Sequence, residues 1–172
     1  MVSTRHTAEL SADELTEIRA LLDAVFVDFD DHDWDHGLGG QHALVREDGL
    51  LVAHGSLVQR RMLVGGRSLR TGYVESVAVR SDRRRRGLAG QVMAALEALA
   101  PAYDLLALGA SDEGVPLYEA RGWQPWRGPT SVLGPSGPEP TPDEDGSVYV
   151  LGGQDVDRDA PIACDYRDGD VW

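Results

Sequence analysis

The sequence contains no lysine, a single cysteine and no long uninterrupted apolar run. Because Cys164 stands alone, no internal disulfide can form, and nothing in the sequence requires an oxidising compartment. The first ten residues lack the apolar core of a signal peptide, and no segment reaches the ~18 apolar residues of a membrane span. These absences predict a cytoplasmic protein without a membrane partner.

Positive charge is also scarce. The sequence has 16 basic residues, all arginine, and 29 acidic residues, which gives a net charge of −13. Such a chain repels phosphate-rich surfaces, which argues against nucleic acid as its main partner. The acidity favours a cationic ligand, although solubility alone is an alternative explanation. The length of 172 residues fits one domain, so we expect residues 1–172 to form a single unit.

Local patterns in the first half predict a helix followed by three strands. Ser11 and Glu14 form a capping box, and apolar residues then recur at helical spacing to about residue 25. Gly and Asp pairs suited to positive φ separate the three β-rich runs that follow. We expect strands at residues 42–47, 50–64 and 67–79. They predict an antiparallel meander.

The second half alternates helices with short strands. A helix is expected from Gly87 to the residue before Pro101, and a second one over residues 112–121. The predicted strands lie at residues 103–108, 123–126 and 147–151, and the Pro- and Gly-rich residues 133–146 are expected to be a loop. This order predicts an α/β fold, in which helices flank a mixed, mostly antiparallel sheet of about six or seven strands.

The segment from Gly72 to Ala89 has the pattern with the most chemical content. A β-rich run leads into an Arg- and Gly-rich loop, which leads into the start of a helix. Backbone N–H groups, the positive end of the helix dipole and guanidinium groups then converge on one place, as a pyrophosphate requires. The alternatives are a solvated basic run and a nucleic-acid contact, and the acidic remainder of the chain disfavours the latter.

Two motifs in this order resemble the GNAT acetyltransferases. Residues 84–89, RRRGLA, are similar to the (Gln/Arg)-x-x-Gly-x-(Gly/Ala) loop of that superfamily. Residues 117–123, LYEARGW, resemble its second signature, a helix that carries a tyrosine and ends in glycine and an aromatic residue. Longer strings, among them GYVESVAVRSD and ARGWQPWRGPTSVLGPSGPEPTPDEDG, look like the aminoglycoside 2′-N-acetyltransferases. The resemblance covers nearly the whole chain.

The resemblance implies the GNAT fold, acetyl-coenzyme A as cosubstrate and a homodimer. The backbone of one strand would bind the pantetheine arm, and an N–H group, that of Val77, would polarise the thioester oxygen. The implied pantetheine residues are Val77, Ala78 and Val79. The implied pyrophosphate residues are Arg84, Arg85, Arg86, Gly87, Leu88 and Ala89.

Two residues are expected to move protons. A protonated amine must lose a proton before it attacks a thioester, and a carboxylate acting through water can take it. Strand alternation predicts Glu75 on the same face as Val77, and the resemblance supports Glu75 as this base. A salt-bridged strand residue is the alternative for Glu75. Tyr118 is expected to donate to the leaving thiolate, with a buried packing role as its alternative.

Scattered acidic groups are expected to hold the cationic acceptor, an aminoglycoside or a related amine. The resemblance implies that Asp28, Asp145, Asp170 and Trp172 with its carboxylate bind it, and Glu75 and Ser76 are expected to join them. Each acid alone fits a solvated loop equally well, but together they fit a cage for a polycation. We therefore expect acetyl transfer to a 2′-amino group by direct attack in a ternary complex, since no covalent nucleophile is evident.

Two other functions remain open, and two metal-site patterns are excluded because required residues are missing. Another GNAT enzyme acting on a polyamine, a metabolite amine or a protein amine is one alternative, and a non-catalytic coenzyme A-binding module is another. His32 and His36 imitate a zinc-protease helix, but the Glu and a third ligand are missing. Asp155, Asp157 and Asp159 imitate a calcium loop that lacks its Gly and its bidentate Glu. We expect no metal.

Overall fold

The computed structural model describes residues 1–172, which group into two compact units. Unit 1 comprises Met1–Val58 and Val74–Leu99, and unit 2 comprises Gln59–Tyr73 and Ala100–Trp172. Two long strands, β3 (Leu50–Val64) and β4 (Arg67–Val79), contribute residues to both units. None of the helices combines the length and the apolar character needed to cross a membrane.

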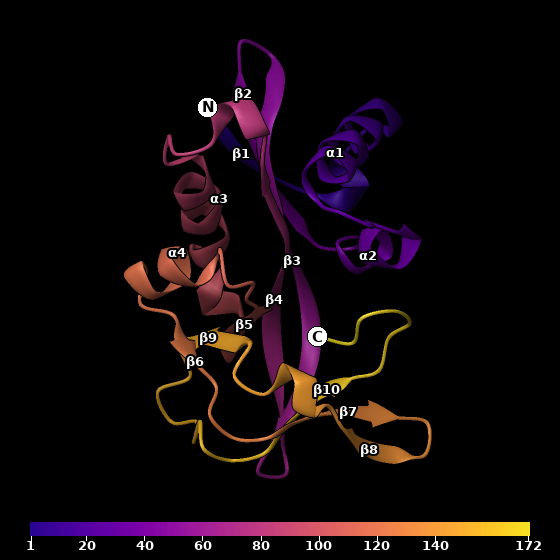
Figure 1. Ribbon diagram of the computed structural model, residues 1–172, viewed down its shortest axis with the longest axis vertical. Helices are drawn as coiled ribbons and strands as arrows, with labels where there is room; N and C mark the ends of the chain where they lie inside the picture. Colours follow the sequence, from indigo (N-terminus) through magenta and orange to yellow (C-terminus); the bar gives the residue numbers. More distant parts are fainter. The chain divides into compact units, whose positions relative to one another are not determined.

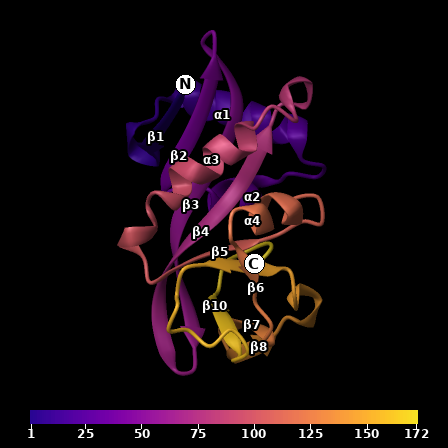
Figure 2. The same cartoon turned by 90° about the vertical axis from the view of Figure 1, so that its left-hand side faces the viewer.

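Unit 1 is built on a short sheet with helices on both sides. β1 (Val2–His6) pairs antiparallel with β2 (Gln41–Glu47), which pairs antiparallel with β3. Figure 1 shows α1 (Ala12–Val25) and α2 (Asp31–His36) on one side of these strands and α3 (Leu88–Glu97) on the other. Figure 2, turned by 90°, shows α3 lying across the strands. Short 3-10 turns, η1 (Thr7–Glu9) and η2 (Ser81–Arg83), follow β1 and β4.

The α1 side holds an apolar core that the helical spacing of the sequence predicts. Ser11 and Glu14 form the expected capping box, so the helix begins at Ala12. The buried residues of this cluster come from α1, from the strands and from the segment that precedes α1: Leu10, Ile18, Leu21, Leu22, Leu44, Leu51 and Ala78. Burial of this face stabilises α1 far more than its helix propensity does.

The α3 side is packed closely enough to require a glycine. A Cβ built on Gly55 of β3 would lie 2.6 Å from Cγ1 of Val92 and 3.3 Å from Cγ2 of Val77. Val92, Met93 and Leu96 of α3 are fully buried. The absent side chain therefore lets α3 approach the strands, which sets the position of its first turn.

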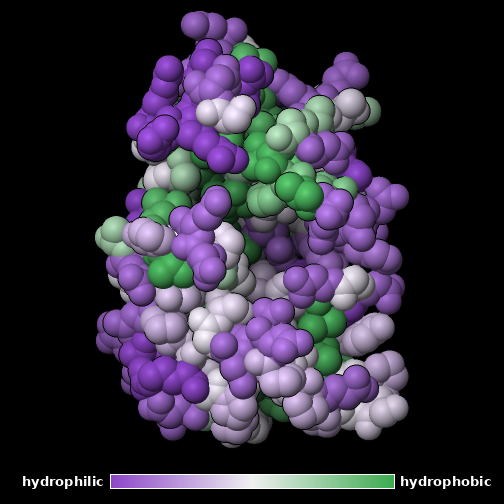
Figure 3. Space-filling model, viewed as in Figure 1, coloured by the Kyte–Doolittle hydropathy of each residue, from purple (hydrophilic) through white to green (hydrophobic).

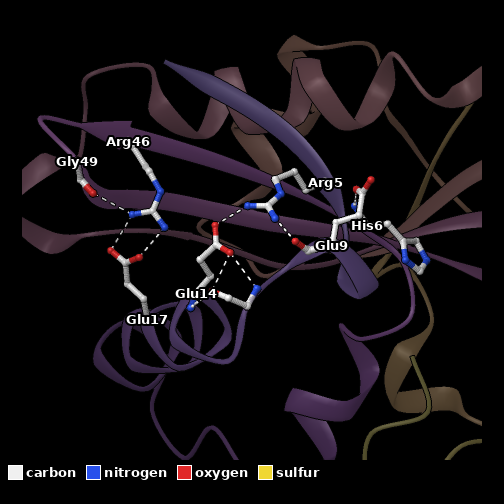
Figure 4. A network of polar contacts seen from close by, with 8 residues as sticks. Arg5, His6, Glu9, Glu14, Glu17, Arg46 and Gly49 are labelled. Carbon is white, nitrogen blue, oxygen red and sulfur yellow. Dashed lines mark hydrogen bonds and ion pairs between the residues drawn. The ribbon is translucent and has the colours of Figure 1, made fainter.

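Ion pairs tie α1 to the strands beside it (Figure 4). Arg46 of β2 donates two hydrogen bonds to the Glu17 carboxylate, the Nη1–Oε1 distance being 3.0 Å, and one to the carbonyl of Gly49. The amide of Leu51 donates to the same carboxylate at 3.1 Å. These hydrogen bonds lower the pKa of Glu17. Arg5 of β1 forms a second ion pair with α1, to Glu14.

Replacing Glu17 by alanine should lower the free energy of unfolding. The variant loses the bidentate pair and leaves the Leu51 amide without its acceptor. Because both side chains are about one-third exposed, solvent screens the pair, and we expect a loss of only about 1 kcal/mol. Chemical denaturation of the Glu17→Ala variant measures it, with the exposed Glu139→Ala as the control. A loss equal to that of the control would contradict a stabilising role for this pair.

Unit 2 contains further strands of the same sheet and one helix, α4 (Val115–Ala120). The strand order of the sheet is β6-β9-β5-β4-β3-β10-β7-β8. The β4–β5 and β10–β7 ladders are parallel, and the β10–β3, β5–β9, β6–β9 and β7–β8 ladders are antiparallel. The strands are β5 (Leu105–Gly109), β6 (Gln124–Pro125), β7 (Thr130–Gly134), β8 (Gly137–Pro140), β9 (Val148–Leu151) and β10 (Ile162–Asp165). Two 3-10 turns, η3 (Ala100–Ala102) and η4 (Pro142–Glu144), complete the unit.

The mixed α/β fold is confirmed, but the sheet has ten strands rather than six or seven. β1 and β10 lack the length and apolar alternation that mark a strand in a sequence, and each is formed by pairing with a partner distant in the chain. The expected loop at residues 133–146 is wrong in part, since it contains β8. This strand lies at the edge of the sheet, where Pro138 and Pro140 are tolerated because one side needs no hydrogen bonds.

On the face drawn in Figure 3 hydrophilic side chains predominate, and a group of apolar side chains is visible in the upper part of the view. The exposed large apolar residues of unit 1 include Phe26, Val27 and Leu50.

Candidate functional site

The loop between β4 and α3 presents unsatisfied backbone donors. Gly87, the N-cap of α3, has φ 75°, and no side chain caps the helix. Arg85 also lies in the left-handed region, with φ 60°. The first intrahelical bond here runs from the Gln91 amide to the Gly87 carbonyl, so the preceding amides of the first turn have no helical acceptor. This is the geometry in which helix N-termini bind anions.

The arginines of this loop fall into two groups. Arg80 pairs with Asp82 at 3.0 Å, and Arg83 pairs with Glu47 at 3.0 Å and with Asp82 at 2.9 Å. Arg84, Arg85 and Arg86 are exposed and form no ion pair. The uncompensated charge therefore lies next to the uncapped helix terminus. Residues 84–89 have the donors and the charge to hold a pyrophosphate.

The C-terminal part of β4 departs from regular strand geometry. Ser76 has φ 52°, which is uncommon for a residue with a side chain. Beyond it, Val77 lies on the α3 side, beside Gly55, and Ala78 is buried in the α1 core. Regular alternation does not pass through a left-handed residue, so it no longer assigns the half-buried Glu75 and Val77 to one face.

A buried polar chain ends on this irregular residue. The Nδ1 atom of His54 lies 3.2 Å from the Ser76 carbonyl oxygen, and its Nε2 atom lies 2.9 Å from Nδ1 of His42. The Thr7 hydroxyl lies 2.8 Å from Nε2 of His42. Burial lowers the pKa of His42 to about 4 and that of His54 to about 3. The sequence analysis missed both histidines, whose only signal is a lone polar residue within each of two apolar strands.

In unit 2, Tyr118 is placed by α4 and by its neighbours. Its ring lies 6.2 Å from the Trp123 ring, and a Cβ at Gly114 would lie 2.7 Å from its Cε2 atom. The side chain is buried, and burial raises the pKa of its hydroxyl. The hydroxyl therefore stays protonated at neutral pH and can act as a hydrogen-bond donor.

A second polar chain in unit 2 connects Asp145 with Trp172. The indole Nε1 of Trp172 donates to the Thr141 hydroxyl at 2.9 Å, and Thr141 donates to the Thr130 hydroxyl at 2.9 Å. Thr130 lies 2.9 Å from Oδ1 of Asp145 and also donates its amide to that atom. Asp170 accepts from the Trp172 amide at 3.0 Å. Three residues expected to bind the acceptor thus form one network.

The remaining expected residues are less tightly held. Asp28 is exposed in the turn between α1 and α2, with φ 59°. Arg167 donates to the main-chain oxygen of Trp172 at 2.8 Å, so this oxygen already has a cationic partner. Cys164 is buried and lies 3.2 Å from the Val171 carbonyl, and burial raises the pKa of its thiol to about 11. A thiol held protonated in this way is a poor nucleophile.

Comparisons with known proteins agree with these features. The family model described as an acetyltransferase (GNAT) domain matches residues 6–126. An aminoglycoside 2′-N-acetyltransferase of Mycolicibacterium fortuitum is 48% identical over 174 residues, covering 97% of this chain and 89% of that protein.

Solved structures share the fold at low identity. The GNAT family N-acetyltransferase YhbS of Escherichia coli, in complex with CoA, is 17% identical with a TM-score of 0.64, over 98% of this chain and 89% of that one. A GNAT family acetyltransferase of Brucella melitensis, in complex with acetyl-CoA, is 15% identical with a TM-score of 0.61, over 98% and 97% of the two chains.

Proposed function

This chain belongs to the GNAT family of acetyltransferases, and from that premise we propose that it acetylates the 2′-amino group of an aminoglycoside. The observation that carries the substrate is the 48% identity, over 97% of the chain, with a protein named for that reaction. The net charge of −13 supports it, because an acidic protein attracts a polycationic sugar.

Acetyl-coenzyme A would be held by two parts of unit 1. The free amides at the start of α3 and the unpaired Arg84, Arg85 and Arg86 fit its pyrophosphate, together with Gly87, Leu88 and Ala89. The ladder between β4 and β5 ends at Tyr73, so the backbone groups of Val77, Ala78 and Val79 take no part in it. This supports their assignment to the pantetheine arm, whose thioester supplies the acetyl group.

The chemistry proposed for the chain is direct transfer in a ternary complex. Glu75, through water, accepts the proton that the ammonium group must lose, so that the amine nitrogen can bond to the acetyl carbon. The N–H of Val77 donates to the thioester oxygen as negative charge develops there. Tyr118 donates a hydrogen bond to the sulfur as the carbon–sulfur bond breaks, and the proton that the acetylated nitrogen gives up converts the thiolate into the thiol of coenzyme A. The buried, protonated thiol of Cys164 supports a mechanism without an acetylated enzyme.

For the acceptor we propose Asp28, Glu75, Ser76, Asp145, Asp170 and Trp172. The hydrogen-bond chain from Trp172 to Asp145 supports their common role, because it fixes the carboxylate of Asp145 in place. We further propose that residues 1–172 act as one GNAT domain, since β3 and β4 contribute to both units. A cytoplasmic homodimer that confers antibiotic resistance completes the proposal.

The experiment that tests this function is thiol release from acetyl-coenzyme A across a panel of amines. The panel contains two aminoglycosides that differ only in a 2′-amino or a 2′-hydroxyl group, together with polyamines and basic peptides. Turnover confined to the 2′-amino compound is the expected result. Turnover on the polyamines or peptides alone would overturn the assignment of an aminoglycoside as substrate. No thiol release with any amine would favour a non-catalytic coenzyme A-binding module.

Replacing Tyr118 by phenylalanine should lower kcat about tenfold, because a hydrogen bond to a developing thiolate is lost. The ring keeps its packing against Trp123, so thermal unfolding should change little. Burial makes the hydroxyl a weaker acid than usual, which favours hydrogen bonding over full proton transfer. Steady-state kinetics measure the effect, and the Tyr149→Phe variant is the control. An unchanged kcat would leave Tyr118 with a packing role alone.

A further inference from the structure

The buried polar chain of unit 1 runs from η1 through β2 and β3 to β4. Its members are the Thr7 hydroxyl, His42, His54 and the Ser76 carbonyl, joined by distances of 2.8, 2.9 and 3.2 Å. Both imidazoles are 1% exposed. Two polar rings in an apolar interior cost stability unless every ring nitrogen has a partner. Here all four nitrogens have one.

The direction of every hydrogen bond in this chain follows from its end point. A carbonyl oxygen can only accept, so Nδ1 of His54 carries the proton. The Nε2 atom of this neutral ring must then accept, which makes Nδ1 of His42 the donor and leaves its Nε2 atom as an acceptor. The Thr7 hydroxyl donates to that nitrogen.

The other contacts of Thr7 agree with this direction. The Gly39 amide donates to the Thr7 oxygen at 2.9 Å, and the Gly40 carbonyl already accepts from the Thr7 amide at 2.9 Å. The same carbonyl also lies 3.2 Å from the Thr7 hydroxyl oxygen, but Nε2 of His42 is closer at 2.8 Å, so we assign the hydroxyl proton to His42. Both rings are neutral at neutral pH, because burial lowers the pKa of each. With the proton on Nδ1 of each histidine, every hydrogen bond of this polar chain has one donor and one acceptor.

This chain of hydrogen bonds ends at the peptide unit on which the proposed reaction depends. The Ser76 carbonyl and the Val77 N–H belong to the same planar trans peptide, so the direction of one fixes the direction of the other. Ser76 holds a left-handed conformation that its side chain disfavours, and such a residue persists only where its surroundings hold it.

We propose that Thr7, His42 and His54 are positioning residues that hold the Ser76 carbonyl and so direct the N–H of Val77 toward the thioester oxygen. This inference rests on the proposed acetyl transfer. It assigns a positioning role to three residues that lie outside the loop proposed to bind coenzyme A. It also gives a role to two histidines that are buried in β2 and β3.

The first test compares two substitutions of His54. In His54→Asn the side-chain amide lies as many bonds from Cβ as Nδ1 does, and it can still donate to the Ser76 carbonyl. His54→Leu has no donor. We expect His54→Leu to lose about tenfold in kcat with an unchanged KM for acetyl-coenzyme A, and His54→Asn to stay within about threefold of the parent. An undiminished kcat in His54→Leu, or equal losses in both variants, would overturn the proposal.

A second pair covers the case in which His54→Leu does not fold. Thr7→Val removes the hydroxyl at the far end of the chain, and Thr7→Ser keeps it. Without that donor, His42 is free to place its proton on Nε2, which reverses the hydrogen bond to His54. We expect a severalfold loss of kcat in Thr7→Val and none in Thr7→Ser. Equal activity in the two variants would overturn the proposal.

A measurement without an acceptor amine separates this inference from the proposed substrate. Long-range nitrogen–proton NMR correlations should show protons on Nδ1 of both His42 and His54. The Val77 amide proton should shift on binding of acetyl-coenzyme A relative to coenzyme A, and Thr7→Val should reduce that difference. A proton on Nε2 of His54, or a Val77 shift unaffected by Thr7→Val, would overturn the positioning role. Failure of the amine panel alone overturns only the proposed function.

Discussion

Replacing Glu75 by glutamine is expected to lower kcat about 1,000-fold while the affinity for coenzyme A stays unchanged. The amide has nearly the shape of the carboxylate but cannot accept the proton of an ammonium group, and general bases contribute about 10²- to 10⁴-fold to rates. Thiol release at saturating acetyl-coenzyme A measures kcat, and isothermal titration with coenzyme A measures binding.

The control for this variant is Glu139→Gln, which removes the same charge from the exposed edge strand β8. It should retain the parent kcat. A Glu75→Gln variant with parental turnover would assign the base elsewhere. A variant that no longer binds coenzyme A would show that Glu75 supports the fold of β4 instead.

The second large effect concerns the unpaired arginines of the loop that we propose binds coenzyme A. Substituting both Arg85 and Arg86 by alanine is expected to raise the KM for acetyl-coenzyme A about 100-fold. Each guanidinium would contribute a charge-assisted hydrogen bond worth roughly 1.5 kcal/mol, which is about tenfold in affinity. Because the proposal places these groups at the nucleotide end and not at the acetyl group, kcat should change little.

Two controls make this result specific. A double variant of Arg70 and Arg127 removes the same charge from exposed sites that are ion-paired with Asp104 and Asp159, and it should leave KM nearly unchanged. Acetyl-pantetheine, which lacks the pyrophosphate, should be used equally well by the Arg85/Arg86 variant and the parent. If the variant loses the same factor with acetyl-pantetheine, the arginines do not bind the pyrophosphate.

Much of the architecture could be read from local patterns. The capping box before α1, the turn residues at positive φ between β2, β3 and β4, and the Arg–Gly loop before α3 lie where the sequence predicts them. β3 and β4 even have the predicted bounds. These features depend on residues a few positions apart, and steric rules for turns and caps suffice to place them.

Other features depend on pairing between distant segments, and the sequence did not reveal them. β1 and β10 become strands by pairing with segments far away in the chain. β8 pairs with the adjacent β7, but its prolines conceal it, and α2, capped by Asp30, forms in an acidic stretch for which no helix was predicted. The left-handed Ser76 was also unforeseen, although it removes the alternation that would put Glu75 and Val77 on one face. Neither Ser76 nor its neighbours in the sequence are residue types that favour a positive φ.

The sequence by itself determined the family, the Arg–Gly loop before α3, the charge and the helices and strands with strong periodicity. Only the tertiary structure decided which side chains meet. His42, His54 and the Ser76 carbonyl are joined across 12 and 22 positions of sequence, and Trp172 reaches Thr141 across 31. The physical reason is that buried polar groups must find partners wherever packing brings them, and packing is a property of the whole fold.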